Sequence, residues 1–306
     1  MPTTLTRREM LGTSLAAALL GSTARAADTP GASTPRRALR FAHLTDVHVQ
    51  PEKRGGQGLA ACLQHAQNHA DKPELVIFGG DNVMAVDSEE GSARANVQLD
   101  LWHKVLRDEC GVPHLTTVGN HDVRDNKQGE GKKWAVDAYS LPGKHYTHDR
   151  AGWRFVFLDS TLPGEKGYSG KLDDEQFEWL QGVLSDTPKT TPVCVVSHIP
   201  ILAACAYFDG ENEKSGDWQI PGSWVHIDAR RIKDLFYKHP NVRLSLSGHM
   251  HLADEITYLG VKYACNGAVC GNWWDGSYHE FAPAYALVDL FDDGSSKVSL
   301  VNYGWS

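Results

Sequence analysis

Short, largely apolar runs alternate along this chain with longer segments in which apolar residues recur at helical spacing. The apolar runs predict buried strands at 40–45, 75–78, 114–118, 193–196 and 242–246. The helical segments lie between them, at 59–69, 93–106, 173–184 and 227–237. Residues 146–149 and 153–158 predict a hairpin, and a series of β segments punctuated by glycine is expected from 253 onward. The pattern predicts one mixed α/β domain without an internal repeat.

Five short polar motifs interrupt this pattern in a fixed order, and four of them come directly after a predicted strand. The motifs are Asp46-Val47-His48, Gly79-Gly80-Asp81-Asn82, Gly119-Asn120-His121-Asp122, Ser197-His198 and Gly248-His249-Met250-His251. Strand ends in an α/β protein meet at one crevice, so residues far apart in the sequence can lie side by side there. We therefore expect the five motifs to form one site.

The N-terminus has the features of an export signal. Two adjacent arginines, Arg7 and Arg8, precede the mildly apolar stretch 11–21, and residues 24–26 offer a small-residue cleavage site. The pattern predicts a signal peptide at 1–26 that uses the twin-arginine export machinery, which carries folded proteins. An ordinary secretory signal that happens to contain two arginines is the alternative. We then expect a polar linker at 27–38, a single domain at 39–306, and a periplasmic or secreted mature protein.

The charge balance narrows the range of substrates. The 306-residue chain has a formal net charge of −8, and removal of the predicted signal would make it more acidic. An acidic surface repels polyanions, so a nucleic-acid polymer is not an expected partner, whereas a small phosphate ester can still be attracted by bound metal ions. Outside the signal, no stretch approaches the roughly 18 apolar residues of a transmembrane helix.

The six cysteines do not predict a structural metal site, because no two of them form a CxxC pair. Cys194 lies within an apolar strand and is expected to be a buried free thiol. Cys265 and Cys270 flank a short turn, and a disulfide between them is open in an oxidising compartment.

The polar motifs contain enough donors for two metal ions. Carboxylate, amide and imidazole donors without a thiolate favour Mn, Fe, Zn or Co over a soft metal. Two such ions, about 3.5–4 Å apart, would share a hydroxide acidic enough to exist at neutral pH and would neutralise the oxygens of a phosphate ester. The candidate ligands are Asp46, His48, Asp81, Asn120, His198, His249 and His251.

The order D-x-H, G-D, G-N-H-D, H, G-H-x-H resembles the calcineurin-like metallophosphoesterases, and the match runs from Asp46 to His251. The resemblance implies a four-layer αββα sandwich of two mixed β-sheets flanked by helices, with a dinuclear centre at the strand ends. It also implies a division of the ligands. The first metal would take Asp46, His48 and His251, Asp81 would bridge, and the second metal would take Asn120, His198 and His249.

The same resemblance implies a catalytic role for His121, the histidine of the third motif that is not a ligand. It would lie beside the scissile phosphate and protonate the leaving alkoxide. Asp122 would then orient His121 and raise its basicity. We assign no metal to Asn82, which is a candidate turn former, and we expect His43 to make a structural hydrogen bond.

The substrate is less defined than the chemistry. Purple acid phosphatases, a related branch, place a tyrosine three residues after the bridging aspartate, and this chain has Met84 there. The motif set is similar to bacterial cyclic-nucleotide phosphodiesterases and their relatives, which include glycerophosphodiesterases, sugar-nucleotide hydrolases and lipid-linked pyrophosphatases. We favour a phosphodiesterase, with a phosphomonoesterase or pyrophosphatase as the alternative. A non-catalytic metal-binding interaction protein would be expected to lack a ligand or His121, and none is missing.

Two segments outside the motifs are candidates for substrate recognition. Residues 203–224 form a long insertion after His198, of a length typical of lids, and it carries Tyr207. Residues 271–276 place Trp273 and Trp274 among glycines. The functional interpretation is an aromatic wall against the substrate, and the alternative is that one ring packs in the core while the other is partly exposed.

Overall fold

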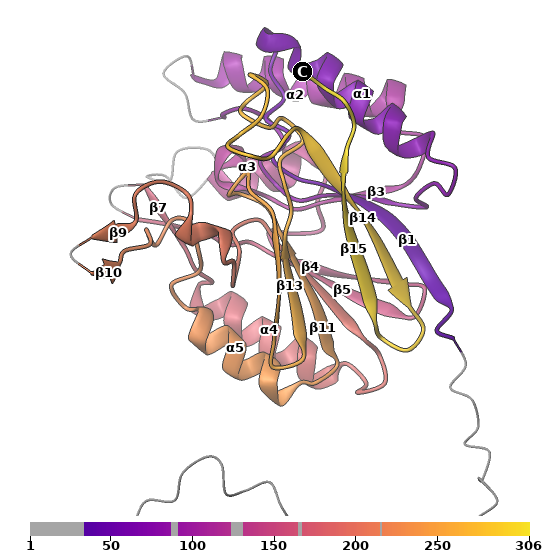
Figure 1. Cartoon of the computed structure of the whole chain (residues 1–306), viewed down its shortest axis with the longest axis vertical. Coiled ribbons are helices and arrows are strands. Elements are labelled where there is room, and N and C mark those ends of the chain that lie inside the picture. The colour runs from indigo at the N-terminus through magenta and orange to yellow at the C-terminus, as the bar shows by residue number, and fades with distance from the viewer. Residues whose placement is uncertain (1–33, 87–90, 124–130, 165–166, 215) are drawn as a thin grey trace, which may run out of the picture. The chain divides into compact units, whose positions relative to one another are not determined.

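Two β-sheets packed face to face form the centre of the domain, with helices on their outer faces (Figure 1). The computed structural model describes residues 34–86, 91–123, 131–164, 167–214 and 216–306. The first sheet has the order β15-β14-β1-β2-β3. Its strands are β1 (Arg37–Leu44), β2 (Val76–Phe78), β3 (His114–Thr116), β14 (Ala284–Phe291) and β15 (Ser296–Asn302). The strands β1, β2 and β3 run parallel, and β14 pairs antiparallel with both β1 and β15.

The second sheet has the order β12-β13-β11-β8-β5-β4. Its strands are β4 (Tyr146–Arg150), β5 (Trp153–Leu158), β8 (Val193–Ser197), β11 (Val242–Ser247), β12 (Asp254–Tyr258) and β13 (Val261–Cys265). The four central strands run parallel, and β4 and β12 are antiparallel edge strands. Two short hairpins lie outside the sheets: β6 (Thr161–Pro163) with β7 (Tyr168–Gly170), and β9 (Glu213–Lys214) with β10 (Asp217–Trp218).

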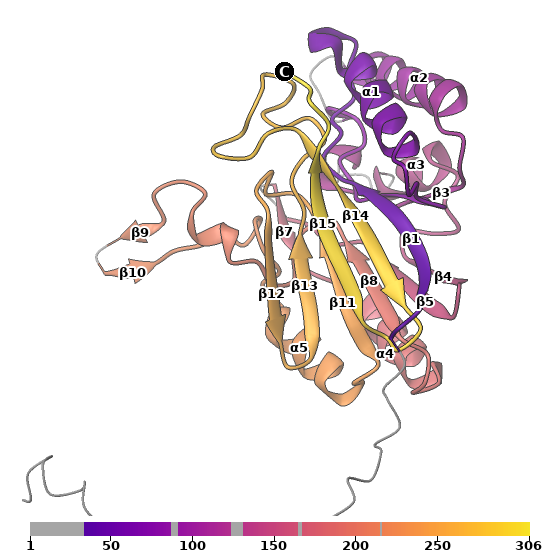
Figure 2. The ribbon, with the colours of Figure 1, turned by 45° about the vertical axis from the view of Figure 1, so that its right-hand side comes forward.

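The helices complete four layers. The first sheet is covered by α1 (Gly55–Gln67), α2 (Gly91–Glu109) and α3 (Gly131–Ala138), and the second by α4 (Asp174–Asp186) and α5 (Ala229–Lys238) (Figures 1 and 2). Short 3-10 turns occur at η1 (Glu52–Arg54), η2 (Asn120–Asp122) and η4 (Cys205–Tyr207). This arrangement confirms the predicted αββα sandwich.

Alternating side chains along the buried strands build three apolar layers. In β2, Ile77 packs in the layer between the sheets, whereas Val76 and Phe78 pack against α1 and α2. In β8, Val196 faces the first sheet and Val195 faces α4 and α5. Because both faces of these parallel strands are covered, their sequences read as continuous apolar runs.

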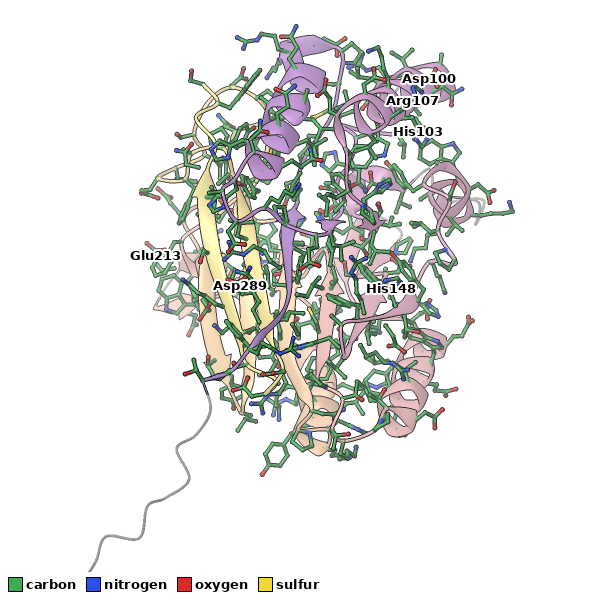
Figure 3. The ribbon with its side chains drawn as sticks, turned by 90° about the vertical axis from the view of Figure 1, so that its right-hand side faces the viewer. Asp100, His103, Arg107, His148, Glu213 and Asp289 are labelled. Atoms are coloured by element: carbon green, nitrogen blue, oxygen red, sulfur yellow. The ribbon has the colours of Figure 1, made fainter. Side chains whose placement is uncertain are left out.

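The first strand, β1, pairs with the C-terminal strand β14. Arg40 of β1 lies opposite Asp289 of β14, and its Nε and Nη2 atoms donate to the two carboxylate oxygens at 2.6 and 2.7 Å (Asp289 is labelled in Figure 3). This paired, partly buried contact places the C-terminal strands beside the first strand, in a different sheet from β11–β13.

Most predicted elements lie within a few residues of the observed ones, including the hairpin β4–β5. The short helix α3 and the β6–β7 hairpin were not predicted, and β1 begins at Arg37, inside the expected linker. The signal peptide at 1–26 and most of the linker lie outside the described residues. In the part of the chain that is described, every helix is too short or too polar to cross a bilayer.

All six cysteines are free thiols, so the disulfide considered between Cys265 and Cys270 is not formed. Cys194 is fully buried in β8, as expected. Cys265 lies at the end of β13, and its thiol donates to the carbonyl of Gly248 at 3.2 Å.

Candidate metal centre and substrate cavity

The five motifs meet where the carboxyl ends of the parallel strands of both sheets converge. The loop after β1 carries Asp46 and His48, and the loop after β2 carries Asp81. Asn120 begins the η2 turn after β3, whereas the three remaining histidines, His198, His249 and His251, follow β8 and β11 of the second sheet. Main-chain hydrogen bonds link the loops, including one from Asp46 N to the carbonyl of Gly80 at 3.1 Å.

The ligands predicted for the first metal lie together. The Nε2 atoms of His48 and His251 are 3.2 Å apart, and Nε2 of His251 is 3.6 Å from Oδ1 of Asp46. Nε2 of His48 is 3.6 Å from Oδ2 of the predicted bridging residue, Asp81. One cation in this space could therefore contact all four side chains.

Two of the ligands predicted for the second metal, His198 and His249, also lie close to Asp81. Nε2 of His198 is 3.2 Å from Oδ2 of Asp81, and His249 offers a nitrogen within 4.8 Å of ligand atoms from both. The Oδ1 atom of Asp81 accepts from the main-chain N–H of His121 at 2.8 Å, which leaves Oδ2 facing the imidazoles.

Unpaired buried atoms show that these residues fit metal ions. Oδ1 of Asp46, Oδ1 of Asn120 and Nε2 of His198 are buried without a hydrogen-bond partner. Such groups are costly to bury unless a partner compensates them. The other carboxylate oxygen of Asp46 is satisfied, because it accepts from Thr45 Oγ1 and from His249 N, each at 2.8 Å. Two cations would supply the missing partners for the orphaned oxygens and nitrogen.

In three of the four candidate histidine ligands, His198, His249 and His251, the second ring nitrogen fixes which atom faces the centre. Nδ1 of His198 donates to the carbonyl of Gly79 at 2.9 Å, and Nδ1 of His251 donates to Gly271 O at 2.5 Å. In His249 the roles are exchanged, because Nε2 donates to Ser223 O at 2.9 Å and leaves Nδ1 for coordination. Such contacts select the tautomer and orient the ring of a metal-binding histidine.

Burial sets the charge state of these rings. It lowers the pKa of His249 to about 3, and it holds the pKa of His48 well below its usual value, so both rings are neutral as coordination requires. Burial also acts to lower the pKa of His198, but the neighbouring carboxylate of Asp81 outweighs it and raises the pKa to about 9. A metal ion would replace the proton of His198 beside Asp81.

The thiol of Cys270 also lies near His48 and His251. It approaches Nδ1 of His251 at 4.0 Å, on the side of the ring opposite to the Nε2 atom that faces Asp46. The structure therefore gives no reason to add a thiolate to the predicted donor set.

His121 projects beside these ligands but is oriented differently from the prediction. Its Nδ1–H donates to the carbonyl of Met84, and its ring packs edge-on against His48 with centroids 4.6 Å apart. In the described part of the chain, no hydrogen bond joins Asp122 to the His121 imidazole. The prediction that Asp122 orients the His121 ring is wrong, because successive side chains of the η2 turn point in different directions.

Asp122 instead ties the loops together. Its carboxylate accepts from Asn82 N and Nδ2 at 3.0 Å, from Gly119 N at 2.9 Å and from the hydroxyl of Tyr139 at 2.7 Å. Asn82, which was assigned no metal, is thus part of the support under Asp81. The predicted hydrogen bond of His43 is also present, since Nδ2 of Asn266 lies 2.7 Å from its Nδ1.

Five of the candidate ligands have left-handed backbone conformations. The φ angles are 52° at Asp46, 46° at His48, 51° at Asp81, 71° at His249 and 56° at His251. Such conformations cost of order 1–3 kcal/mol each and persist where the surrounding structure imposes them, often at functional sites. The approach of the loops is also close: a Cβ atom at Gly248 would lie 1.9 Å from Thr45 Oγ1. The fold holds these loops in place at the expense of local stability.

A cavity of about 260 Å³ opens onto the candidate centre. It is lined by His48, Asp81, Asn120, His121, Tyr168, Asp209, Trp224, His249, Met250, His251, Trp273 and Tyr278. Trp273 lies against His251, with ring centroids 4.4 Å apart, so its predicted place beside the substrate is consistent with the structure.

Two predicted substrate contacts are wrong. Trp274 is only 5% exposed, donates from Nε1 to the carbonyl of His48 at 3.0 Å and packs against Gly58 of α1. Tyr207 does not line the cavity; it is 41% exposed and packs against Trp218 of the insertion. Of the two adjacent tryptophans, Trp274 therefore packs in the core and Trp273 lines the cavity.

Four cavity residues were not among the predicted substrate contacts: Tyr168, Asp209, Trp224 and Tyr278. Two of them come from the insertion at 203–224, which carries η4 and the projecting β9–β10 hairpin (Figure 2). The insertion was identified from its length and its aromatic and acidic residues. No spacing rule shows which of those side chains turn back toward the metal centre.

Comparison with known families agrees with this geometry. The model of the calcineurin-like phosphoesterase family matches residues 39–253, which include every candidate metal ligand. The chain belongs to this family. A calcineurin-like phosphoesterase of this kind is a metal-dependent hydrolase of phosphoric esters, so the chain is an enzyme.

Several relatives of this calcineurin-like enzyme have names that specify a phosphodiester. A probable cyclic nucleotide phosphodiesterase from Synechococcus sp. is 26% identical over 225 residues, 70% of this chain and 74% of the relative. A 3',5'-cyclic adenosine monophosphate phosphodiesterase from Pseudomonas aeruginosa is 26% identical over 246 residues, 79% of each chain. A probable glycerophosphodiester phosphodiesterase from Arcobacter nitrofigilis is 26% identical over 197 residues, 64% of this chain and 63% of the relative.

A solved structure shows the same fold. The crystal structure of a dimetal phosphatase from Danio rerio aligns with a TM-score of 0.60 at 15% identity, covering 88% of this chain and 100% of that chain. The similarity supports the sandwich architecture.

Proposed function

We propose that this enzyme is an exported phosphodiesterase that uses two metal ions. In this proposal His121 is the general acid that protonates the leaving group. The observation that carries the choice of a diester is the composition of the cavity. Aromatic side chains line it, and its described lining residues include no lysine or arginine. A phosphomonoester is close to a dianion at neutral pH, since its second pKa is about 6. A phosphodiester has a single negative charge and a second ester substituent, which aromatic side chains of the cavity can contact.

The described side chains would divide the work as follows. Asp46, His48 and His251 would hold one ion, and Asn120, His198 and His249 the other. Asp81 lies between the two sets and would contact both ions. Bound there, the pair would supply an activated water nucleophile and neutralise phosphate charge. The identity of the metals, Mn, Fe or Zn, depends on supply as well as on these ligands.

The geometry of His121 suits a general acid. Because Nδ1–H donates to the Met84 carbonyl, any second proton resides on Nε2, and His121 is one of the side chains that line the cavity. As the bond from phosphorus to the leaving oxygen breaks, the Nε2 proton would pass to that oxygen and leave a neutral ring. The main-chain N–H of His121 meanwhile holds Asp81, so the acid and the central carboxylate keep a constant separation.

The test is a hydrolysis panel with manganese-loaded enzyme. Bis(p-nitrophenyl) phosphate reports diesterase chemistry, and p-nitrophenyl phosphate reports monoesterase chemistry. A cyclic nucleotide, a glycerophosphodiester, a sugar nucleotide and a phospholipid then define the substrate class. We expect diesters to be favoured in kcat/KM, with elemental analysis giving two metals per chain. Faster turnover of monoesters or of the sugar nucleotide would favour the phosphomonoesterase or the pyrophosphatase instead.

Export is a separate part of the proposal and is supported by Arg7, Arg8 and the apolar stretch that follows them. Transport in a folded state would allow the metal ions to be bound before export. Fractionation of cells that express the full chain would locate it. We expect the wild type in the periplasm or medium and a variant with Arg7→Lys and Arg8→Lys retained in the cytoplasm. Export of both proteins would favour an ordinary secretory signal.

A further inference from the structure

We propose that the cavity contains a subsite for a positively charged group on an ester substituent of the substrate. The subsite is formed by Asp209, Trp224, Trp273 and Tyr278, and we call it the Asp209 subsite. This subsite rests on the proposed function, because it specifies which diesters the enzyme hydrolyses. They are diesters in which one esterified alcohol carries a quaternary or primary ammonium group.

The first argument is the charge of Asp209. Its side chain is 15% exposed and lines the cavity next to the candidate metal centre. In the proposed scheme the two metal ions compensate the charge of the phosphate. A further carboxylate in the same cavity therefore acts on the rest of the ligand, where it disfavours an additional anionic group and favours a cationic one.

The second argument is that the protein does not neutralise this carboxylate. Within the described residues, no lysine or arginine forms an ion pair with Asp209. Its Oδ1 accepts from the hydroxyl of Tyr278 at 2.7 Å, and Nε2 of the partly exposed His279 lies 3.6 Å away and is charged only when protonated. Tyr278 remains neutral, because burial and the hydrogen bond to Asp209 raise its pKa to about 12. A cationic ligand would complete the arrangement.

The third argument is the aromatic surroundings of Asp209. Tyr278 packs edge-on against Trp273 with ring centroids 5.6 Å apart. Trp224 lies next to Gly210, where an added Cβ atom would be 3.9 Å from the indole. Groups of aromatic rings are the surroundings in which proteins bind quaternary ammonium groups.

A neutral hydroxyl could also donate to Asp209, but it would leave the negative charge uncompensated. We therefore commit to the cation, and comparison with a neutral ligand of the same shape distinguishes the two. Choline and 3,3-dimethylbutan-1-ol form such a pair, because a carbon atom replaces the charged nitrogen.

The binding experiment does not depend on turnover. Choline and its neutral isostere are titrated into the metal-loaded full chain at constant ionic strength, with tryptophan fluorescence and calorimetry as readouts. We expect choline to bind on the order of tenfold more tightly than the isostere. Asp209→Asn should abolish this preference, whereas Glu213→Gln should retain it. Glu213 is the matched control, because it is an exposed acid of the same insertion on β9, outside the cavity (labelled in Figure 3).

The hydrolysis experiment compares glycerophosphocholine with the glycerophosphodiester of 3,3-dimethylbutan-1-ol. We expect wild type and Glu213→Gln to share a preference in kcat/KM for the cationic diester, and Asp209→Asn to lose it. Equal binding of choline and its isostere by the wild type would overturn the subsite, as would an unchanged preference in Asp209→Asn. Activity on bis(p-nitrophenyl) phosphate alongside such a result would leave the proposed diesterase intact. If that activity is absent, the proposed function fails, and the binding experiment still decides whether the subsite exists.

Discussion

The Nδ1–H of His121 donates to the main-chain carbonyl of Met84, three residues after the central aspartate of the metal centre. This contact orients the ring without a carboxylate partner. It also connects the candidate acid to the loop that carries Asp81. The side chain at position 84 is immaterial to the hydrogen bond, since the carbonyl comes from the backbone.

We expect His121→Ala to lower kcat on bis(p-nitrophenyl) phosphate by roughly 10²–10⁴-fold, because the leaving alkoxide would lose its proton donor. Metal content should stay at the wild-type value, since the ring holds no metal in the proposed scheme. Steady-state kinetics and elemental analysis on the same preparation check both points. A variant with wild-type kcat would remove His121 from the mechanism.

Asp122 should act on the stability of the fold rather than on the orientation of the His121 ring. Asp122→Ala removes a buried carboxylate that joins Asn82, Gly119 and Tyr139, and we expect the free energy of unfolding to fall by roughly 3 kcal/mol. Tyr139→Phe removes one of these hydrogen bonds and should cost about 1–2 kcal/mol. Urea denaturation of the chelated proteins measures both. If Asp122→Ala is as stable as wild type and only the pH profile of kcat shifts, the supporting role is disproved.

The left-handed conformation at His249 predicts an unusual order of stability. In the metal-free protein, we expect His249→Gly to be more stable than His249→Ala by about 1 kcal/mol, because glycine adopts a positive φ without strain. His198 is the matched control, since it is another candidate ligand at a strand end but has no positive φ. There the alanine variant should be the more stable one, by about 0.5–1 kcal/mol. The same order at both sites would contradict the interpretation.

The adjacent tryptophans should differ in what they affect. Trp274→Ala empties a core position between α1 and the metal-binding loop, and we expect a loss of about 3–5 kcal/mol of folding stability. Trp273→Ala should leave the free energy of unfolding within about 1 kcal/mol of wild type and raise KM for the natural diester. Thermal denaturation and steady-state kinetics separate the two outcomes. Equal destabilisation by both variants would place both rings in the core.

His43 should make the protein sensitive to acid. Burial, followed by the repulsion of His198, lowers the pKa of His43 to about 3, whereas the unfolded chain has the usual value of about 6.5. Below pH 6.5 the unfolded state therefore binds one more proton than the folded state. This group then reduces the free energy of unfolding by about 1.4 kcal/mol for each further pH unit down to the folded pKa.

His43→Gln removes that proton site, so its stability should fall less steeply between pH 6.5 and 5 than that of the wild type. Denaturation midpoints of both proteins, measured after chelation, give the two slopes. Other titrating groups are common to both proteins and cancel in the comparison. Parallel slopes would show that His43 does not contribute.

The sequence was most informative where chemistry and strand ends coincide. Asp46, Asp81 and His198 each follow an apolar run, and the parallel arrangement of such strands brings their carboxyl ends to one edge. The strands themselves were recognisable because both of their faces are buried. Local sequence and the expected topology were enough to place every candidate ligand.

The errors arose where tertiary packing decides between neighbours. Trp273 and Trp274 are equivalent in composition, and only the position of Gly58 on α1 shows which ring has space in the core. Asp209 reaches the cavity because its insertion folds back onto Tyr278, a contact between segments that are far apart in the sequence. Asp122 is next to His121 in sequence, but its partners come from the loop after β2 and from Tyr139.

Each proposed metal site takes donors from both β-sheets, since Asp46 and His48 follow β1 while His251 follows β11. Movement of one sheet relative to the other would separate the ligands of both sites at once. Two bound ions would therefore cross-link the two sheets. By mass action, each ion present at a hundredfold excess over its dissociation constant would add about 2.7 kcal/mol to the free energy of unfolding. The lifetime of the folded enzyme would then depend on the metal supply of its surroundings as directly as its rate does.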